Sequence, residues 1–483
     1  MKTIIVILIA LVLAGCAVGP DYRRPLVDTP SAWRVEEKQA KDLANTAWWE
    51  QFNDPVLNKL IETALKENYD LKIATARVEE YAGRYMVGRS GLFPQIYAAG
   101  GGGRERVTER GPSSVPTGTD NPATLYQGVF TGAWEIDVWG RLRRLTEAAR
   151  ADLLSTEEGR RAVILTLISA VANSYVRLRD LDKELEISQN TAKSRAESYA
   201  IFKLRFEGGI VSVVELSQVK SEYELALSRI PFILKNIAFQ ENALSVLLGR
   251  NPGPIPRGKT IDELTLPAVP AGLPSDLLEQ RPDIRQAEQD LTAANARIGA
   301  AKALYFPTIS LTGAFGWAST DLSNLFSGPS QAWNWAGSFT APIFAGGAIT
   351  GNYQATQAVE QQVLFRYQQS IQTAFREVND SLADQRLTRE QLEAQKRQVE
   401  ALNDYARVAR LRYDEGYTSY LEVLDAERSL FNAELEYTQS QGALFQALVN
   451  LYKAMGGGWV TEADKMTAQP VISDWWPVAG EKQ

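Results

Sequence analysis

Residues 204–209 read LRFEGG and residues 411–416 read LRYDEG, and the likeness of these two stretches indicates an internal duplication. The offset between their last glycines is 416 − 209 = 207 residues, and the same offset pairs Ser212 with Ser419. Several ordered matches at one spacing are the signature of a repeated structural unit. The sequence therefore predicts two copies of one plan over about residues 55–455.

Each copy is predicted to run helix, strand, strand and then two long helices. The tripeptides LFP (92–94) and YFP (305–307) match at an offset of 213, and their prolines end the first helix of each copy. The long segments at about 141–206 and 348–414 contain no proline. About 66 residues at a rise of 1.5 Å form a rod of roughly 100 Å. Since no globular core accommodates such a rod, we expect a coiled coil or a tube of helices.

Composition excludes several classes of function. The chain of 483 residues has a net charge of −7, no histidine and one cysteine. An acidic chain without a concentrated basic patch argues against nucleic-acid binding. The absence of histidine removes the commonest general base and metal ligand, and one cysteine allows no intrachain disulfide. We expect no cofactor, no metal site and no enzymatic activity.

The N-terminus carries an export signal. Residues 1–16 read MKTIIVILIALVLAGC, with an apolar run too short to span a bilayer as a helix. The end of this run, Leu13-Ala14-Gly15-Cys16, resembles the lipobox of bacterial lipoproteins, in which the cysteine is acylated. That resemblance implies a lipid on Cys16 and sorting to the outer membrane, because Ala17 stands where the inner-membrane retention signal has Asp.

Short segments with alternating apolar and polar side chains lie in both copies. The pattern is clear in 126–139, 308–317 and 333–344 and poor in the Gly-rich segment 95–106. Alternation places one face of a strand on an apolar phase, and strands of about ten residues with terminal aromatics are typical of transmembrane β-barrels. A soluble sandwich gives the same alternation, but the lipoprotein leader and the Trp-rich strand ends favour the membrane.

Four strands are too few for a closed barrel. Small barrels need about eight strands, and open strand edges are not stable in lipid. Several copies of the chain must therefore contribute strands to one barrel.

The chain resembles the outer membrane factor family of the TolC/OprM type over nearly its whole length. The resemblance is carried by CAVGPDYRRP (16–25), WWEQFNDPVL (48–57), GLPSDLLEQRPDI (272–284) and the segment 413–426. It implies a homotrimer with a twelve-stranded outer-membrane barrel and a periplasmic tunnel of twelve long helices. It also implies that a periplasmic adaptor and an inner-membrane pump, commonly of the resistance-nodulation-division type, are partners. The chain would be a passive exit duct for small toxic compounds.

The turns between the paired long helices are the predicted gate. In the family a tyrosine and acidic residues on the second-repeat turn help to constrict the entrance, and the matching residues are Tyr413, Glu422 and Asp425. The family's arginine falls on Thr418, so Arg412 is the candidate to replace it.

Local sequence motifs indicate a structural role for these acidic residues as an alternative to gating. Ser212-x-x-Glu215 and Ser419-x-x-Glu422 both have the pattern of a capping box, which favours Glu422 as a helix cap. Asp425 is not at a cap and either forms an ion pair with Arg428 or contributes to an acidic ring at the entrance. Its first-repeat counterpart is Gln218, so the ring would come from second-repeat helices alone. Glu135 and Asp137, on the polar face of a strand, are expected to face water in the barrel.

Two other functions remain open on these residues. A lipid-anchored periplasmic adaptor also uses helical hairpins, but it would lack the strands and the duplication. A secreted carboxylate glycosidase needs two acids about 5–9.5 Å apart, and no pair is singled out.

The expected layout begins with a signal peptide (1–15) and a lipidated segment (16–54). The first repeat (55–270) has strands at 94–106 and 125–139 and long helices at 141–206 and 212–249. The second repeat (271–455) has strands at 307–318 and 333–345 and long helices at 348–414 and 419–455, and a tail (456–483) without assigned role follows.

Overall fold

The computed structural model describes residues 17–30, 32–34, 47–108, 110, 118, 120–269, 274, 276–457 and 459–472. The predicted signal peptide (1–15), the predicted lipid attachment residue Cys16 and the Trp475-Trp476 pair of the tail lie outside these residues. The chain divides into two compact units. Unit 1 comprises Met1–Pro25, Glu79–Ser155 and Ala287–Tyr367, and unit 2 comprises Leu26–Val78, Thr156–Gln286 and Gln368–Gln483.

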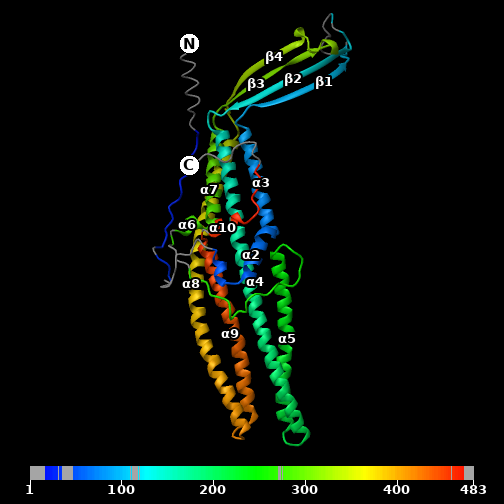
Figure 1. Cartoon of the computed structure of the whole chain (residues 1–483). Coiled ribbons are helices and arrows are strands. Elements are labelled where there is room, and N and C mark those ends of the chain that lie inside the picture. Colours follow the sequence, from blue (N-terminus) through cyan, green and yellow to red (C-terminus); the bar gives the residue numbers. More distant parts are fainter. Residues whose placement is uncertain are drawn as a thin grey trace. The chain divides into compact units, whose positions relative to one another are not determined.

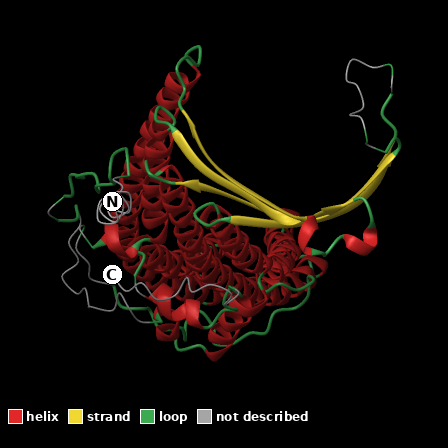
Figure 2. Ribbon diagram, turned by 90° about the horizontal axis from the view of Figure 1, so that it is seen from above, coloured by secondary structure: helices red, strands yellow, loops and turns green. Residues whose placement is uncertain are grey.

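Unit 1 contains a four-stranded antiparallel sheet with the strands in chain order, curved as Figure 2 shows. Its strands are β1 (Gln95–Glu105), β2 (Ala123–Ile136), β3 (Thr308–Ser319) and β4 (Gln331–Thr340). Neighbouring strands pair along almost their full lengths. In the described chain β1 and β4 each pair on one side only, so both outer edges of the sheet are open.

The strand register separates an aromatic face from a polar face, as the alternation predicts. One row across the sheet joins Ala98, Phe130, Phe315 and Trp333, and the adjacent row joins Tyr97, Thr131, Ala314 and Asn334. Directly opposed residues in neighbouring strands share a face. Large apolar side chains on the first face are exposed in this chain: Trp333 69%, Trp335 76% and Phe339 67%. This face therefore needs an apolar environment.

In the Gly-rich strand β1, where the alternation of apolar and polar side chains is weakest, a side chain of β2 covers one of the glycines. Gly102 opposes Tyr126 of β2, and a Cβ added to Gly102 would lie 2.7 Å from the Tyr126 ring. The tyrosine ring thus covers the glycine, which explains why a side chain is missing at this position.

Two strands end earlier than the sequence predicts. β4 stops at Thr340, so Ile343 and Phe344 are outside the sheet. Pro342 follows and has no N–H to continue the ladder. β2 stops at Ile136. Trp139 lies in the following turn, where its Nε1 donates to the Pro307 carbonyl at 2.8 Å and its ring stacks on Phe306.

The helices occur in matched pairs. α3 (Tyr69–Ser90) and α7 (Pro282–Ala303) each have 22 residues, and α4 (Arg141–Glu207) and α8 (Ala348–Asp414) each have 67. The returning helices are α5 (Val213–Leu247) and α9 (Tyr420–Met455). In Figure 1, α4 and α5 run side by side to one turn, and α8 and α9 run to another. The predicted rods of 66 residues are confirmed.

The core of unit 2 is rich in aromatic side chains and includes three elements outside the predicted helices and strands. These are η1 (Trp48–Phe52), α2 (Pro55–Glu67) and α10 (Trp459–Lys465), while α6 (Leu277–Gln280) is a short helix before α7. Trp48 is fully buried, stacks on Tyr452 at 5.2 Å and meets Trp459 edge-on at 6.0 Å. Asp54, also fully buried, caps α2 and accepts a hydrogen bond from the Tyr175 hydroxyl at 2.7 Å. Thus the start of the tail, through α10, belongs to the core.

One described helix, α4, is long and apolar enough to cross a membrane by length and composition alone. Ile164, Ile168 and Val171 in this helix are buried in the core of unit 2. The apolar stretch is therefore explained by packing between helices.

Candidate gate at the turns of the helical hairpins

The two hairpin turns have the same backbone form. α4 ends at Glu207 and α8 at Asp414, and each is followed by a glycine with positive φ, Gly209 at 73° and Gly416 at 78°. The Ile210 and Tyr417 N–H groups bond back to the carbonyls of Arg205 and Arg412, at 2.8 Å each. Glycine adopts this left-handed conformation without steric cost, so it terminates both helices.

The side chains at the two turns differ. The Ser212 capping box is confirmed, with the Glu215 carboxylate 2.7 Å from the Ser212 N–H and the Ser212 hydroxyl 3.2 Å from the Glu215 N–H. The capping box predicted at Ser419 is wrong, because Ser419 makes no side-chain cap bond.

Glu422 accepts a charge-assisted bond from Arg412 at 2.8 Å and a bond from the Thr418 hydroxyl. In the bond from Arg412 both partners are ionised, so it is an ion pair as well as a hydrogen bond. Glu422 therefore ties the end of α8 to the start of α9, and Arg412 and Thr418 act on the same carboxylate. Arg412 and Glu422 thus form an ion pair within the second-repeat turn, and the replacement of the family's arginine by Arg412 stays a prediction.

Tyr413 is held by the first repeat. Its hydroxyl accepts a hydrogen bond from Arg205 Nη1 at 2.6 Å. Its ring meets Tyr420 edge-on at 5.0 Å and is parallel to that of Phe202 at 6.4 Å. Arg205 is the repeat counterpart of Arg412, and it was missed because no local pattern connects residues 208 positions apart. This bond links the two hairpins directly.

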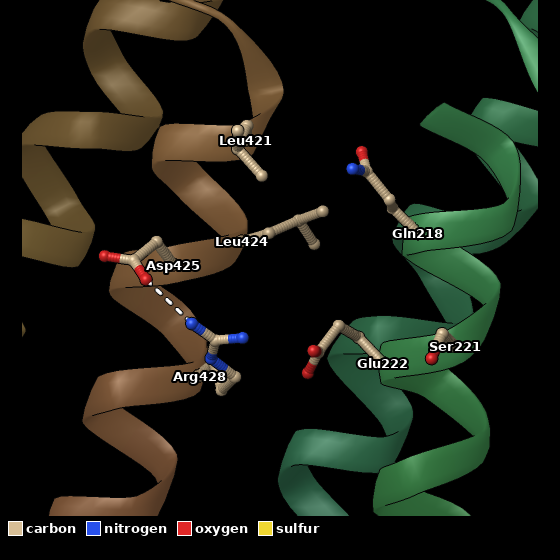
Figure 3. A pocket seen from close by; sticks show the side chains of 7 residues that line it. All are labelled: Gln218, Ser221, Glu222, Leu421, Leu424, Asp425 and Arg428. Atoms are coloured by element: carbon tan, nitrogen blue, oxygen red, sulfur yellow. Dashed lines mark hydrogen bonds and ion pairs between the residues drawn. The ribbon is translucent and has the colours of Figure 1, made fainter. Parts of the chain in front are cut away.

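Asp425 lies on the wall of a cleft between α5 and α9, drawn in Figure 3. It pairs with Arg428 at 2.9 Å, as the sequence predicts, and both side chains are about half exposed. The cleft has a volume of about 400 Å³. Besides this pair it is lined by Gln218, Ser221, Glu222, Leu421 and Leu424. Gln218 and Asp425, matched by the repeat offset, face the same space.

A buried arginine supports the cleft from α4. Arg195 is 4% exposed, forms an ion pair with Glu222 of α5 at 3.0 Å and lies over the Phe431 ring of α9 at 5.2 Å. Burial lowers the pKa of Arg195, and Glu222 and Glu427 oppose that shift. Arg410 of α8 pairs with Glu427 of α9 at 2.6 Å. Four helices near the turns are thus joined through arginines, none of which the sequence singled out as a site.

Glu135 and Asp137 have structural partners. The Arg141 guanidinium donates two hydrogen bonds to the Glu135 carboxylate, at 2.7 and 3.1 Å. Asp137 lies beyond the end of β2 and accepts from the Leu142 and Arg143 N–H groups, so it caps α4. The expectation that Asp137 is a strand residue facing water is wrong, because the carboxylate serves the helix that follows.

Among the described residues no cluster of three or more His, Cys, Asp or Glu side chains has the arrangement of a metal site. The site at the turns consists of hydrogen bonds, ion pairs and packed rings between helices. Such an arrangement holds helices together and can be rearranged without breaking covalent bonds.

The profile of the family described as "Outer membrane efflux protein" matches residues 60–250 and 273–457, which include the long helices and strands of both halves. The chain belongs to the outer membrane efflux protein family. It is 36% identical over 470 residues to the probable efflux pump outer membrane protein TtgC of Pseudomonas putida, covering 96% of this chain and 97% of the relative. It is also 36% identical over 457 residues to the cation efflux system protein CusC of Escherichia coli, covering 93% and 97%.

Solved structures of outer-membrane efflux proteins share the fold. The CmeC outer membrane channel of Campylobacter jejuni matches with a TM-score of 0.87 at 26% identity, over 94% of this chain and 99% of CmeC. The MtrE outer membrane channel of Neisseria gonorrhoeae, solved in its open state, matches with a TM-score of 0.82 at 31% identity, over 92% and 99%. The protein is an outer-membrane channel component of an efflux pump. The similarity to channel proteins supports this function over the alternative prediction of a lipid-anchored periplasmic adaptor.

Proposed function

We propose that three copies of the chain form one passive duct through the outer membrane and the periplasm. The observation that carries this proposal is the four-stranded sheet with an exposed aromatic face and two open edges. In lipid every backbone N–H and C=O group needs a hydrogen-bond partner, and the groups along an open strand edge have none. Three such sheets supply twelve strands, enough for a barrel with an aqueous lumen.

The anchoring, partners and cargo follow from this role. Cys16 carries the lipid that holds the mature N-terminus at the membrane, and the duct needs no cofactor and catalyses no reaction. A periplasmic adaptor and an inner-membrane pump deliver the cargo and the energy. Relatives are named for efflux of antibiotics, toluene, solvents and cations. We propose small toxic compounds as the cargo here.

Assembly and conduction can be tested together. The purified protein should migrate as a trimer in a native gel without boiling and as a monomer after boiling. In planar bilayers it should open discrete ion-conducting channels. A monomer that binds no detergent micelle and conducts nothing would overturn the proposal.

The gate is proposed to lie at the hairpin turns, with Asp425, Tyr413, Glu422 and Arg412 as its residues. Asp425→Ala removes a carboxylate and its ion pair with Arg428 from the cleft. It should raise the single-channel conductance if that pair holds the entrance narrow, or lower the preference for cations, because three acidic side chains near an axis attract cations. Lys465→Ala, at an exposed side chain of α10, is the control. Unchanged conductance and selectivity would remove Asp425 from the gate.

A further inference from the structure

Two arginines lie where strand β1 ends, on the side of the sheet turned away from the helices. β1 follows shortly after α3, so it starts near the helices and runs away from them, as Figure 1 shows. Arg104 is the last residue but one of β1, and Arg106 follows the strand. Because the helices of this outer-membrane channel extend into the periplasm, the two arginines lie at the cell surface.

The strand register places both arginines on the aromatic face of the sheet. Arg104 pairs with the residue two positions before Tyr126 in β2, so it shares a face with Tyr126. Beyond the strand, the Asn121 side-chain amide continues the pairing: it accepts from the Val107 N–H at 2.9 Å and donates to the Val107 carbonyl at 2.7 Å. The chain therefore stays aligned with β2 through residue 107. Since positions two apart in a strand share a face, Arg106 continues the face of Arg104.

Aromatic side chains on this face mark the level of the membrane surface. Tyr126 lies opposite the residue two positions before Arg104. Trp317 of β3 lies on the same face and meets Phe326 edge-on at 5.6 Å. Tyr and Trp side chains gather where the hydrocarbon of a bilayer meets its headgroups. Arg104 is about 7 Å beyond the level of Tyr126, which places it among the headgroups of the outer leaflet.

Both arginines are exposed, and within the described part of the chain neither forms an ion pair. Glu105, between them, belongs to the polar face. At the opposite end of the sheet, by contrast, Arg141 pairs with Glu135 at 2.7 Å. The two cations on the aromatic face therefore take an anion from outside the chain.

Phosphate is the anion that suits this position. A guanidinium group donates two parallel hydrogen bonds to phosphate oxygens, and arginine is the preferred residue for such contacts. Positions two apart on a strand are separated by about 7 Å, so the pair can bind two phosphate groups of one lipid. The phosphate-bearing lipid of the outer leaflet is lipopolysaccharide, whose lipid A part carries these groups.

We propose that Arg104 and Arg106 form a binding site for the phosphate groups of lipopolysaccharide on the outer surface of the barrel. The aromatic face below them contacts the acyl chains of the same lipid, so the site joins charge recognition to apolar contact. The inference rests on the proposed barrel and names a lipid that this barrel binds.

Binding of purified lipid A tests the site. The trimer in detergent is mixed with lipid A that carries both phosphates, and the lipid bound per trimer is counted by native mass spectrometry over a concentration series. Arg104→Gln/Arg106→Gln should weaken binding by about tenfold or more, because hydrogen bonds to charged groups are lost. Arg104→Lys/Arg106→Lys keeps the charge and should retain part of the affinity.

Two controls separate this site from general effects of charge. Arg376→Gln/Arg407→Gln removes two arginines from exposed positions of α8 and should bind lipid A normally. Lipid A without phosphates should bind the unsubstituted trimer no better than lipid A with phosphates binds the glutamine variant. Excess inorganic phosphate should leave lipid A bound, and its full displacement would assign the site to the free ion.

Equal binding of lipid A by the glutamine variant and the unsubstituted protein overturns the site and leaves the proposed function intact. A variant with fewer trimers, whose remaining trimers bind lipid A normally, also overturns it, because the arginines then serve the contact between copies. If the glutamine variant forms no trimers, the lysine variant and the phosphate-free lipid decide. Absence of trimers in the unsubstituted protein overturns both proposals.

Discussion

At the scale of single residues, the bond between Arg205 and Tyr413 connects the two hairpins. A hydrogen bond to a charged group contributes about 1.5–3 kcal/mol, and each 1.4 kcal/mol changes an equilibrium about tenfold. Arg205→Ala should therefore increase the open fraction of single channels in planar bilayers by about tenfold or more. Tyr413→Phe, which keeps the ring and removes only the hydroxyl, should do the same.

The double variant decides whether the two side chains act through one bond. If they do, combining Arg205→Ala with Tyr413→Phe should add little to either change alone. Fully additive effects, or unchanged gating in both single variants, would show that this bond does not restrain the turns.

Asp180 makes the stability of unit 2 depend on pH. It is 1% exposed on α4, and burial raises the pKa of its carboxyl to about 7, with Glu184 adding to the rise and Arg177 opposing it. An unfolded Asp has a pKa near 3.9. Between about pH 4 and 7 the folded protein therefore binds more protons, so its stability falls as pH rises through this window.

Asp180→Asn removes the titrating proton but keeps an acceptor for Arg177. The variant should melt at a higher temperature than the unsubstituted protein at pH 8 and show a shallower dependence of melting temperature between pH 4 and 7, followed by circular dichroism in detergent. Glu186→Gln, at an exposed carboxylate, is the control. An identical slope in the Asp180→Asn protein would contradict the assignment.

At the scale of elements, the buried Arg160 connects α4 to α10. Arg160 pairs with Asp464 at 2.5 Å and donates to the Ala468 carbonyl and the Thr75 hydroxyl, each at 3.0 Å. Removing one partner of a buried ion pair costs about 3–5 kcal/mol. Arg160→Ala should therefore lower the melting temperature and expose the segment after α10 to limited proteolysis.

A surface pair on the same helix provides the comparison. Lys465 and Glu462 are both more than half exposed, and such pairs contribute about 0–1 kcal/mol. Lys465→Ala should leave melting and proteolysis unchanged. Equal effects of the two substitutions would mean that α10 is held by its apolar contacts and not by Arg160.

Elements with strong local patterns were predictable from the sequence, and contacts between distant segments were not. The long helices follow from 66 residues without proline, and the strand faces follow from alternation. The Ser419 capping box failed because Arg412 competes for Glu422. The bond of Arg205 to Tyr413 and the burial of Trp459 depend on tertiary packing. No motif of a few residues contains that information.

At the scale of the whole molecule, the two faces of the sheet should tolerate charge differently. Phe315 lies on the aromatic face of β3, and its neighbour Ala314 lies on the polar face. An arginine on the lipid face of a barrel costs about 2–4 kcal/mol near the bilayer centre. Phe315→Arg should therefore reduce the amount of trimer recovered from outer membranes.

Ala314→Arg is the matched change on the other face. It should assemble normally and shift ion selectivity toward anions, because its charge enters the water-filled lumen. Recovery of equal trimer from both variants would mean that the aromatic face does not contact lipid.

The equal length of α4 and α8, 67 residues each, limits how this protein can change. In a tunnel whose wall alternates between hairpins containing α4 and hairpins containing α8, all the tips end at the same height only while the two kinds of hairpin have the same length. An insertion in one half of the chain would leave three tips projecting beyond the other three and open the closure between them. Lengthening or shortening the duct therefore requires matched changes in both halves of the gene.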